Sequence, residues 1–189
     1  MQFEIVTDSS SNLKEEMIEE FGLHILPLTF MVDGEDEVYQ SYLNGKHTDL
    51  KDFYTMMREG KVFKTSLPNL AESEKLIRGL LEEGRDVLYI GFSSGLSGTY
   101  VATELLIKDL AKEFPERKVF AVDTLAASGG EGLLVWHAVQ RAQAGESIEQ
   151  VRDWLEENKL HLAHWFTVDD LMFLFRGGRV SKTSAWAGT

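Results

Sequence analysis

The chain has 189 residues and a net charge of −12, from 31 acidic and 19 basic residues, and its 43% of apolar residues suffice for one well-packed domain or one domain and part of another. The acidic balance argues against nucleic-acid binding and against general attraction to anionic membrane surfaces. The absence of cysteine excludes disulfides, thiolate chemistry and Cys-ligated metal centres, and it suits a cytoplasmic protein.

No segment suggests targeting or membrane insertion. The N-terminus MQFEIVTDSS begins as a strand and lacks the basic and apolar regions of a signal peptide. No apolar run approaches the ~20 residues that a membrane-spanning helix needs. We therefore expect a cytoplasmic protein without stable membrane insertion.

The first half of the chain alternates β-rich runs with helical patterns. Residues 3–7 predict a strand, and residues 8–12 (DSSSN) are typical caps of the helix that follows. Residues 23–32 predict a second strand, in which Pro27 lacks a ladder N–H and indicates an edge strand or a bulge. The other elements predicted here are a short strand near 38–42 within the irregular stretch 33–49, a helix over 50–58, a loop over 65–68, and a helix that Asn69 caps and Gly84 ends.

The second half is organised around residues 87–100 (VLYIGFSSGLSGTY), which predict a buried strand, a Gly/Ser turn and a helix that opens at about Ser97. The elements predicted after it are the rest of that helix to Pro115, a strand over 118–122, a helix over 126–144, a helix that opens with a Ser147/Gln150 capping box, a strand over 161–168, and a short helix over 169–175. Residues 180–189 have no clear period.

This alternation predicts an α/β fold, a three-layer α/β/α arrangement with a mostly parallel sheet, plus the beginning of a second domain. In such sheets, ligands bind beyond the carboxyl ends of the strands. The polar stretches 8–11, 93–98 and 123–124 each follow a predicted strand. We expect them to gather on one edge of the sheet, where a binding site would lie.

One interpretation of the central turn is a nucleophile elbow. Residues 91–95 match G-x-S-x-G, and Ser93, Asp123 and His137 follow in the chain order of an α/β-hydrolase triad. However, His137 lies inside a predicted helix, whereas a triad histidine must reach the serine. A serine hydrolase is therefore the alternative function.

The favoured interpretation of the same turn is an anion site. It offers serine hydroxyls and the N–H groups of a helix start, where the helix dipole favours negative charge. A nucleotide phosphate would require a nearby Lys or Arg, and the nearest in sequence is Lys108, on the far side of its helix. A carboxylate needs only a few hydrogen-bond donors. The alternative is a serine-rich turn that only caps its helix.

A basic cluster stands out in the acidic chain. Arg176 and Arg179 flank two glycines, and Lys182 follows them. The cluster is either a turn with solvated charges or a contact for an anion or a partner. Because no histidines share a face at ligand spacing, we expect no metal, and we expect no cofactor.

Five motifs together resemble the DegV family of bacterial fatty-acid-binding proteins. They are IVTDSSSNL (5–13), KTSLPN (64–69), SSGLSGTY (93–100), VFAVDT (119–124) followed by SGGEG (128–132), and VDDLMFLFRGGRVS (168–181). The resemblance implies a carrier of long-chain fatty acids and not an enzyme. It also implies that hydroxyls of two loops hold the carboxylate. These map onto Thr65, with Ser66 as a weaker candidate, and onto Ser93 or Ser94, of which we favour Ser94. Gly98 and Thr99 complete the turn.

The resemblance also implies a partner. Family members serve as the binding subunit of a fatty acid kinase, in which an ATP-dependent subunit phosphorylates the bound carboxyl for phospholipid synthesis. Arg176 and Arg179 would contact that partner or the phosphorylated head group. Family members continue past the RGGRVS motif, so we expect residues 1–160 to form the first domain and residues 161–189 to begin a second, incomplete one.

Overall fold

The computed structural model of the chain describes residues 1–34, 38–40 and 50–187. Its strands are β1 (Glu4–Asp8), β2 (His24–Leu26), β3 (Thr29–Val32), β4 (Val38–Gln40), β5 (Phe63–Ser66), β6 (Val87–Gly91) and β7 (Val119–Asp123). Its α-helices are α1 (Glu15–Phe21), α2 (Leu50–Arg58), α3 (Leu70–Glu82), α4 (Thr99–Glu113), α5 (Ser128–Gln143), α6 (Ile148–Asn158), α7 (Leu171–Arg176) and α8 (Lys182–Ala187). Two 3-10 turns are η1 (Ser9–Ser11) and η2 (Lys159–His161).

The main sheet has four parallel strands in the order β2-β1-β6-β7. Val6 of β1 pairs with His24 on one side and with Tyr89 on the other. Every residue of β6 is buried, as expected for an apolar strand that is covered on both faces. The predicted mostly parallel sheet is confirmed.

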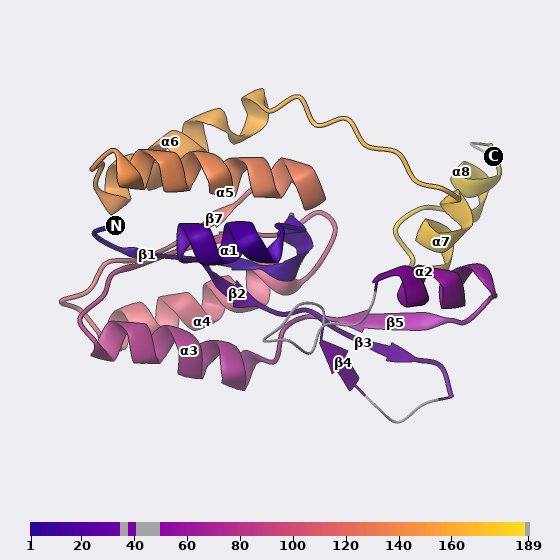
Figure 1. Cartoon of the computed structure of the whole chain (residues 1–189), viewed down its shortest axis with the longest axis horizontal. Helices are drawn as coiled ribbons and strands as arrows, with labels where there is room; N and C mark the ends of the chain where they lie inside the picture. The colour runs from indigo at the N-terminus through magenta and orange to yellow at the C-terminus, as the bar shows by residue number, and fades with distance from the viewer. Residues whose placement is uncertain (35–37, 41–49, 188–189) are drawn as a thin grey trace.

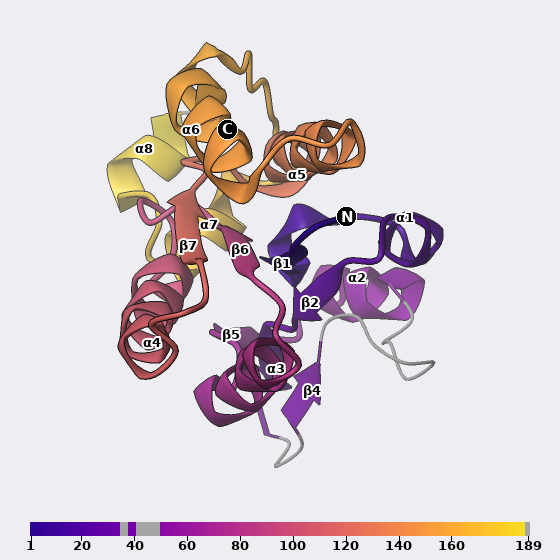
Figure 2. The same cartoon turned by 90° about the vertical axis from the view of Figure 1, so that its left-hand side faces the viewer.

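Helices cover both faces of this sheet, so the predicted three layers are confirmed. Helices α1, α5 and α6 lie on one face, and α3 and α4 lie on the other (Figures 1 and 2). Alternating residues of a strand point to opposite faces. Accordingly, Ile5 packs in the core on the α5 side, and its neighbour Val6 packs in the core on the α3 side.

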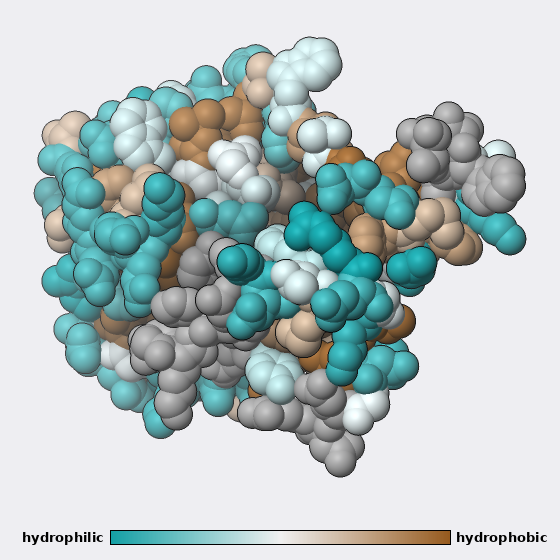
Figure 3. Space-filling model, turned by 45° about the vertical axis from the view of Figure 1, so that its right-hand side comes forward, coloured by the Kyte–Doolittle hydropathy of each residue, from teal (hydrophilic) through white to brown (hydrophobic). Residues whose placement is uncertain are grey.

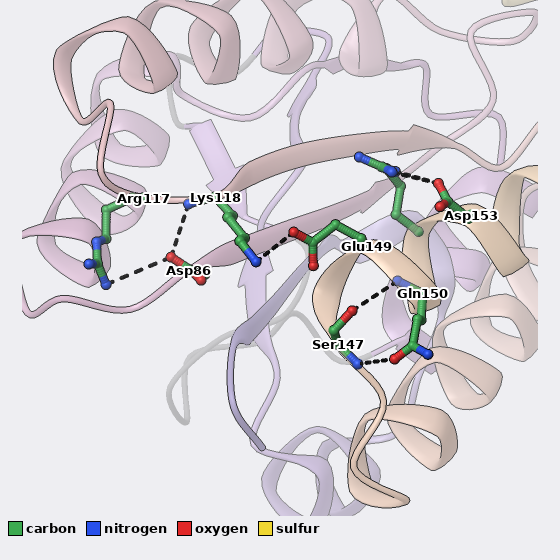
Figure 4. Close-up of polar contacts among 8 residues, drawn as sticks. Asp86, Arg117, Lys118, Ser147, Glu149, Gln150 and Asp153 are labelled. Carbon is green, nitrogen blue, oxygen red and sulfur yellow. Dashed lines mark hydrogen bonds and ion pairs between the residues drawn. The ribbon is translucent and has the colours of Figure 1, made fainter.

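Caps fix the starts of two of these helices, as the sequence predicts. Asn69 accepts hydrogen bonds from the backbone N–H groups of Ala71 and Glu72 at the start of α3. At the start of α6, Ser147 and Gln150 form the predicted reciprocal capping box (Figure 4). The same end of α6 is joined to the start of β7 by an ion pair of 2.6 Å between Glu149 and Lys118.

A second sheet is antiparallel, in the order β4-β3-β5. It packs against α2 through aromatic rings. The ring of Phe53 from α2 lies 5.0 Å from that of Phe30 and 4.6 Å from that of Phe63.

Two predictions from the sequence change in this region. The single strand over 23–32 is two strands in different sheets, because Pro27 ends β2 at the edge of the main sheet. Thr65 and Ser66 lie in β5 and not in a loop. The predicted strand near 38–42 corresponds to β4, and residues 41–49 lie outside the described residues.

The predicted strand over 161–168 is wrong. The chain forms η2 and then an irregular segment in which Trp165 is 93% exposed and Phe166 is 75% exposed. A strand requires a neighbour for its ladder, and no described strand lies beside this segment. The segment leads to α7, which Asp170 caps, and α8 follows although the sequence shows no helical period there. The division into domains at residue 160 remains a prediction.

Among the described residues, no helix is long and apolar enough to cross a bilayer. The face in Figure 3 is mostly hydrophilic, with separate apolar patches.

Candidate functional site

The polar stretches that follow β1, β6 and β7 meet at one edge of the main sheet, as predicted. The Asp8 carboxylate accepts a hydrogen bond of 3.0 Å from the Phe92 N–H. The Asp123 carboxylate accepts one of 3.2 Å from the Ser94 N–H. The Thr124 hydroxyl donates one of 2.7 Å to the carbonyl of Gly91. The turn between β6 and α4 is therefore held from both sides by the neighbouring strand ends.

A pocket of about 280 Å³ opens beside this turn. It lies between the turn, β5, the link from β2 to β3, and the turn after α7. Its lining combines hydroxyl groups, one cation and apolar side chains. The lining residues are Leu28, Thr65, Ser66, Leu67, Phe92, Ser97, Gly98 and Arg179. A concave site with apolar walls and a few convergent polar groups is typical of a small-molecule site, and the volume of this pocket lies just below the usual range of about 300–1,000 Å³.

The start of α4 borders the pocket through Ser97 and Gly98. Gly98 caps this helix without a side-chain hydrogen bond. Ser97 Oγ accepts a hydrogen bond of 3.2 Å from the Thr99 N–H and lies 2.9 Å from the Thr99 hydroxyl. The N–H groups and dipole of a 15-residue helix favour an anion at this end.

The structure brings four of the predicted site residues together and leaves others outside the pocket lining. Thr65, Ser66, Gly98 and Arg179 line the pocket. Of the other predicted residues, Ser93 and Thr99 are buried, and the Ser93 hydroxyl accepts a hydrogen bond from the Gly95 N–H. Ser94 is exposed. The guanidinium of Arg176 lies 5.5 Å from the ring centre of Phe173.

Sequence reasoning missed four lining residues, the apolar Leu28, Leu67 and Phe92 and the polar Ser97. Ser97 belongs to the SSGLSGT motif, and its position directly before the helix start is the signal that could have identified it. Phe92 carries no such signal, because its place depends on the hydrogen bond from its backbone N–H to Asp8.

The three residues of the hydrolase alternative are not brought together. His137 stands nine residues into α5, roughly 13 Å along the axis from its start. Its ring packs 5.1 Å from that of Trp154. Among the hydrogen bonds of the described residues, none joins His137 to Ser93 or Asp123. The Asp123 carboxylate instead accepts from the backbone N–H groups of Ser94 and Leu125.

Two buried carboxyl groups, Asp8 and Glu131, lie beneath the turn, and both residues are 0% exposed. Burial, followed by the charge of Asp8, raises the pKa of Glu131 to about 10. Burial also raises the pKa of Tyr89, whose hydroxyl donates a hydrogen bond of 2.9 Å to Asp8. The Asp8 carboxyl is thus enclosed under the turn, where it binds the Tyr89 hydroxyl and the Phe92 N–H.

Comparison with known proteins gives a consistent result over the whole chain. Residues 2–189 match the model of the family described as "Uncharacterised protein, DegV family". A DegV domain-containing protein of Clostridium perfringens is 37% identical over 190 residues, which cover 100% of this chain and 64% of that protein. A DegV domain-containing protein of Streptococcus pyogenes serotype M1 is 38% identical over 191 residues, which cover 65% of its length.

Solved structures agree with the sequence matches. A DegV family protein from Thermus thermophilus, described by its fatty acid binding, superposes with a TM-score of 0.81 at 34% identity, over 100% of this chain and 64% of its own. A stearic acid-binding protein from Eubacterium ventriosum superposes with a TM-score of 0.84 at 25% identity, over 99% of this chain and 64% of its own. The chain therefore spans 64–65% of the length of these relatives.

Proposed function

The chain belongs to the DegV family, and we propose that it binds a long-chain fatty acid by its carboxylate at the pocket between β5 and the turn before α4. The observation that carries this proposal is the lining of that pocket. Hydroxyls of Thr65 and Ser97, the start of α4 and the cation of Arg179 line the same small space. The solved DegV structures described as fatty-acid-binding proteins support the choice of ligand.

The chemistry of the lining fits a carboxylate followed by an alkyl chain. Hydrogen bonds to a charged acceptor contribute about 1.5–3 kcal/mol each. Leu28, Leu67 and Phe92 offer apolar surface to the first methylene groups, each of which contributes about 0.8 kcal/mol when buried. The pocket is the head-group end of the site in this proposal, and further wall is needed for a long acyl chain.

Thr65 is the first half of the proposed carboxylate clamp, with Ser66 beside it on β5. The second half of the proposed clamp consists of Ser97 and Gly98, which line the same pocket. Ser93, Ser94 and Thr99, which the family resemblance also indicates, belong to the same turn and remain candidates for contact with a bound ligand.

Direct binding tests the proposal. Native mass spectrometry of the purified chain, with stearic acid added, should show one fatty acid per chain. The matched control is the methyl ester of the same acid, which lacks the negative charge and should bind much more weakly. Equal binding of acid and ester, or binding of neither, would refute a carboxylate site.

We further propose that a partner acts on the bound acid in the cytoplasm. The partner is an ATP-dependent fatty acid kinase subunit that forms an acyl phosphate for phospholipid synthesis, and this chain does not catalyse the transfer itself. Exposed Arg176 and Arg179 would meet the partner or the new phosphate. Arg179→Gln should lower both fatty acid affinity and acyl phosphate formation by the kinase, whereas Arg176→Gln, outside the pocket lining, should lower only the latter. Unchanged acyl phosphate formation in both variants would refute the contact.

A further inference from the structure

Two carboxyl groups, Asp8 and Glu131, share one hydroxyl in the interior beneath the pocket turn. The Ser10 hydroxyl oxygen lies 2.5 Å from a carboxyl oxygen of Asp8 and 2.6 Å from one of Glu131. Both carboxyl residues are 0% exposed, and among the described residues neither forms an ion pair with Lys, Arg or His. Two buried, unpaired charges so close together would be very costly, so one group should carry a proton.

The hydroxyl donors near Glu131 are already used. A hydroxyl has only one hydrogen to donate. The Thr7 hydroxyl donates to the carbonyl of Ile90 at 2.8 Å, and it is 3.4 Å from Glu131. Ser10 cannot donate to both carboxyl groups. An ionised Glu131 would therefore lack donors, whereas a protonated Glu131 can donate to Ser10, which in turn donates to Asp8.

Asp8, in contrast, is surrounded by donors. One carboxylate oxygen accepts from the backbone N–H of Ser10 at 3.1 Å and from its hydroxyl. The other accepts from the Tyr89 hydroxyl at 2.9 Å and from the Phe92 N–H at 3.0 Å. Several donors aimed at one carboxylate stabilise its ionised form. The donor arrangement thus distinguishes the two carboxyl groups.

We propose that Glu131 is a neutral acid, that Asp8 is its ionised neighbour, and that this pair positions the pocket wall through Phe92. The positioning role rests on the proposed function, whereas the protonation states do not. The Phe92 N–H is bound by Asp8, and the neighbouring Ser9 hydroxyl accepts from the Leu28 N–H at 3.0 Å. Leu28 and Phe92 are both apolar lining residues of the pocket. Asp8 and Glu131 are not among the residues that line the pocket, so they are positioning residues.

The pKa of Glu131, raised by burial and by Asp8 to about 10 from its ordinary value near 4.5, agrees with this assignment. The titratable groups that face it are Asp8 from β1 and Tyr89 from β6, and the ring of His164 packs on the adjacent Gly130. Because the folded state holds a proton that the unfolded state releases above about pH 4.5, this group's contribution to stability is complete at low pH. This stabilisation is lost as the pH rises toward 10. Over that interval the folding equilibrium constant falls by up to about tenfold for each pH unit.

Two measurements without lipid test the protonation states. The first is urea unfolding of the wild type and of Glu131→Gln, a variant that keeps a donor toward Ser10, at pH 5 and pH 8. The ratio of the folding constant of the variant to that of the wild type should be about a hundredfold or more larger at pH 8 than at pH 5. Glu157→Gln, at an exposed position, should show no such gain. Infrared spectra at pH 7 should contain the C=O band of a protonated carboxyl in the wild type and lack it in Glu131→Gln.

The opposite assignment predicts opposite results. If Asp8 were the neutral acid, Asp8→Asn would remove the infrared band and flatten the pH dependence, and the proposal would be overturned. Absence of the band from the wild type would also overturn it, even if no variant folded. For the positioning role, folded Asp8→Asn should bind stearic acid at least tenfold more weakly, and unchanged affinity would refute that role. Failure of the wild type to bind fatty acid would instead refute the proposed function and leave the protonation states standing.

Discussion

Thr65 and Ser97 stand on different elements, β5 and the turn before α4, and both line the pocket. We expect Thr65→Ala and Ser97→Ala each to weaken stearic acid binding by roughly tenfold or more, because each removes a hydrogen bond worth about 1.5–3 kcal/mol to a charged acceptor. Titration calorimetry measures the change. Thr55→Ala, at an exposed position on α2, is the matched control and should bind as the wild type does.

The outcome at Ser94 completes this test. Ser94 is exposed, and its backbone N–H is bound to Asp123. If Ser94→Ala weakens binding and Ser97→Ala does not, the proposed role of Ser97 is wrong and the clamp predicted from the family resemblance stands. If neither Thr65→Ala nor Ser97→Ala weakens binding, the carboxylate is not held at this pocket.

Motif reasoning could predict Thr65, Ser66, Gly98 and Arg179 as candidates, because each lies in a stretch with a recognisable chemical composition. It could not select among the serines of one turn. The course of the backbone through this turn decides which hydroxyl borders the pocket. That course is fixed by hydrogen bonds with the side chains of Asp8, Asp123 and Thr124. Those bonds come from strands distant in sequence, so local pattern carries little information about them.

At the scale of elements, the hydrogen bond from Tyr89 of β6 to Asp8 of β1 joins the two strands, and it requires a glycine at position 91. A Cβ atom at Gly91 would lie 2.5 Å from the hydroxyl oxygen of Tyr89, which is fully buried and bonded to Asp8. We therefore expect Gly91→Ala to destabilise the protein by about 2 kcal/mol or more, as overpacking does in a close-packed core. Urea unfolding provides the measurement.

The control for this substitution is Gly79→Ala in α3. A Cβ atom there meets nothing within 4 Å, and the position is helical. This variant should be more stable than the wild type by up to about 1 kcal/mol, since alanine favours the helix. Equal effects of the two substitutions would contradict the account of β6.

Elements with a strong local signal could be predicted, such as the buried strand β6 and the Ser147 capping box of α6. The strand expected over 161–168 fails for a physical reason. Its β-rich composition is real, but Trp165 and its neighbours have no strand beside them among the described residues. Strand formation is decided by pairing, and pairing is not a local property.

At the scale of the whole molecule, the side chain of Trp165, in the segment before α7, contributes little to the folded core. Trp165 is 93% exposed, whereas Trp154 on α6 packs against the core and under Arg141, at 4.7 Å. We expect Trp165→Ser to change the free energy of unfolding by less than about 0.5 kcal/mol and Trp154→Ser to lower it by roughly 2 kcal/mol. A large loss for Trp165→Ser would mean that the Trp165 side chain is buried in solution, and it would contradict this account.

The main sheet and its covering helices follow from the alternation of strands and helices, so they could be predicted. The second sheet could not, because β3 pairs with β5 across more than thirty residues and the aromatic side chains of Phe30, Phe53 and Phe63 meet only after that pairing. The pocket lies where the two sheets and the turn after α7 approach one another. It is a property of the assembled molecule.

A crystal structure of the chain grown with stearic acid would test the central claim most directly. The account predicts elongated electron density whose carboxylate lies within hydrogen-bond distance of the hydroxyls of Thr65 and Ser97, at the start of α4 and beside Arg179. Density for the carboxylate elsewhere on the protein, or a carboxylate pointing to solvent with the alkyl chain against Thr65, would contradict it.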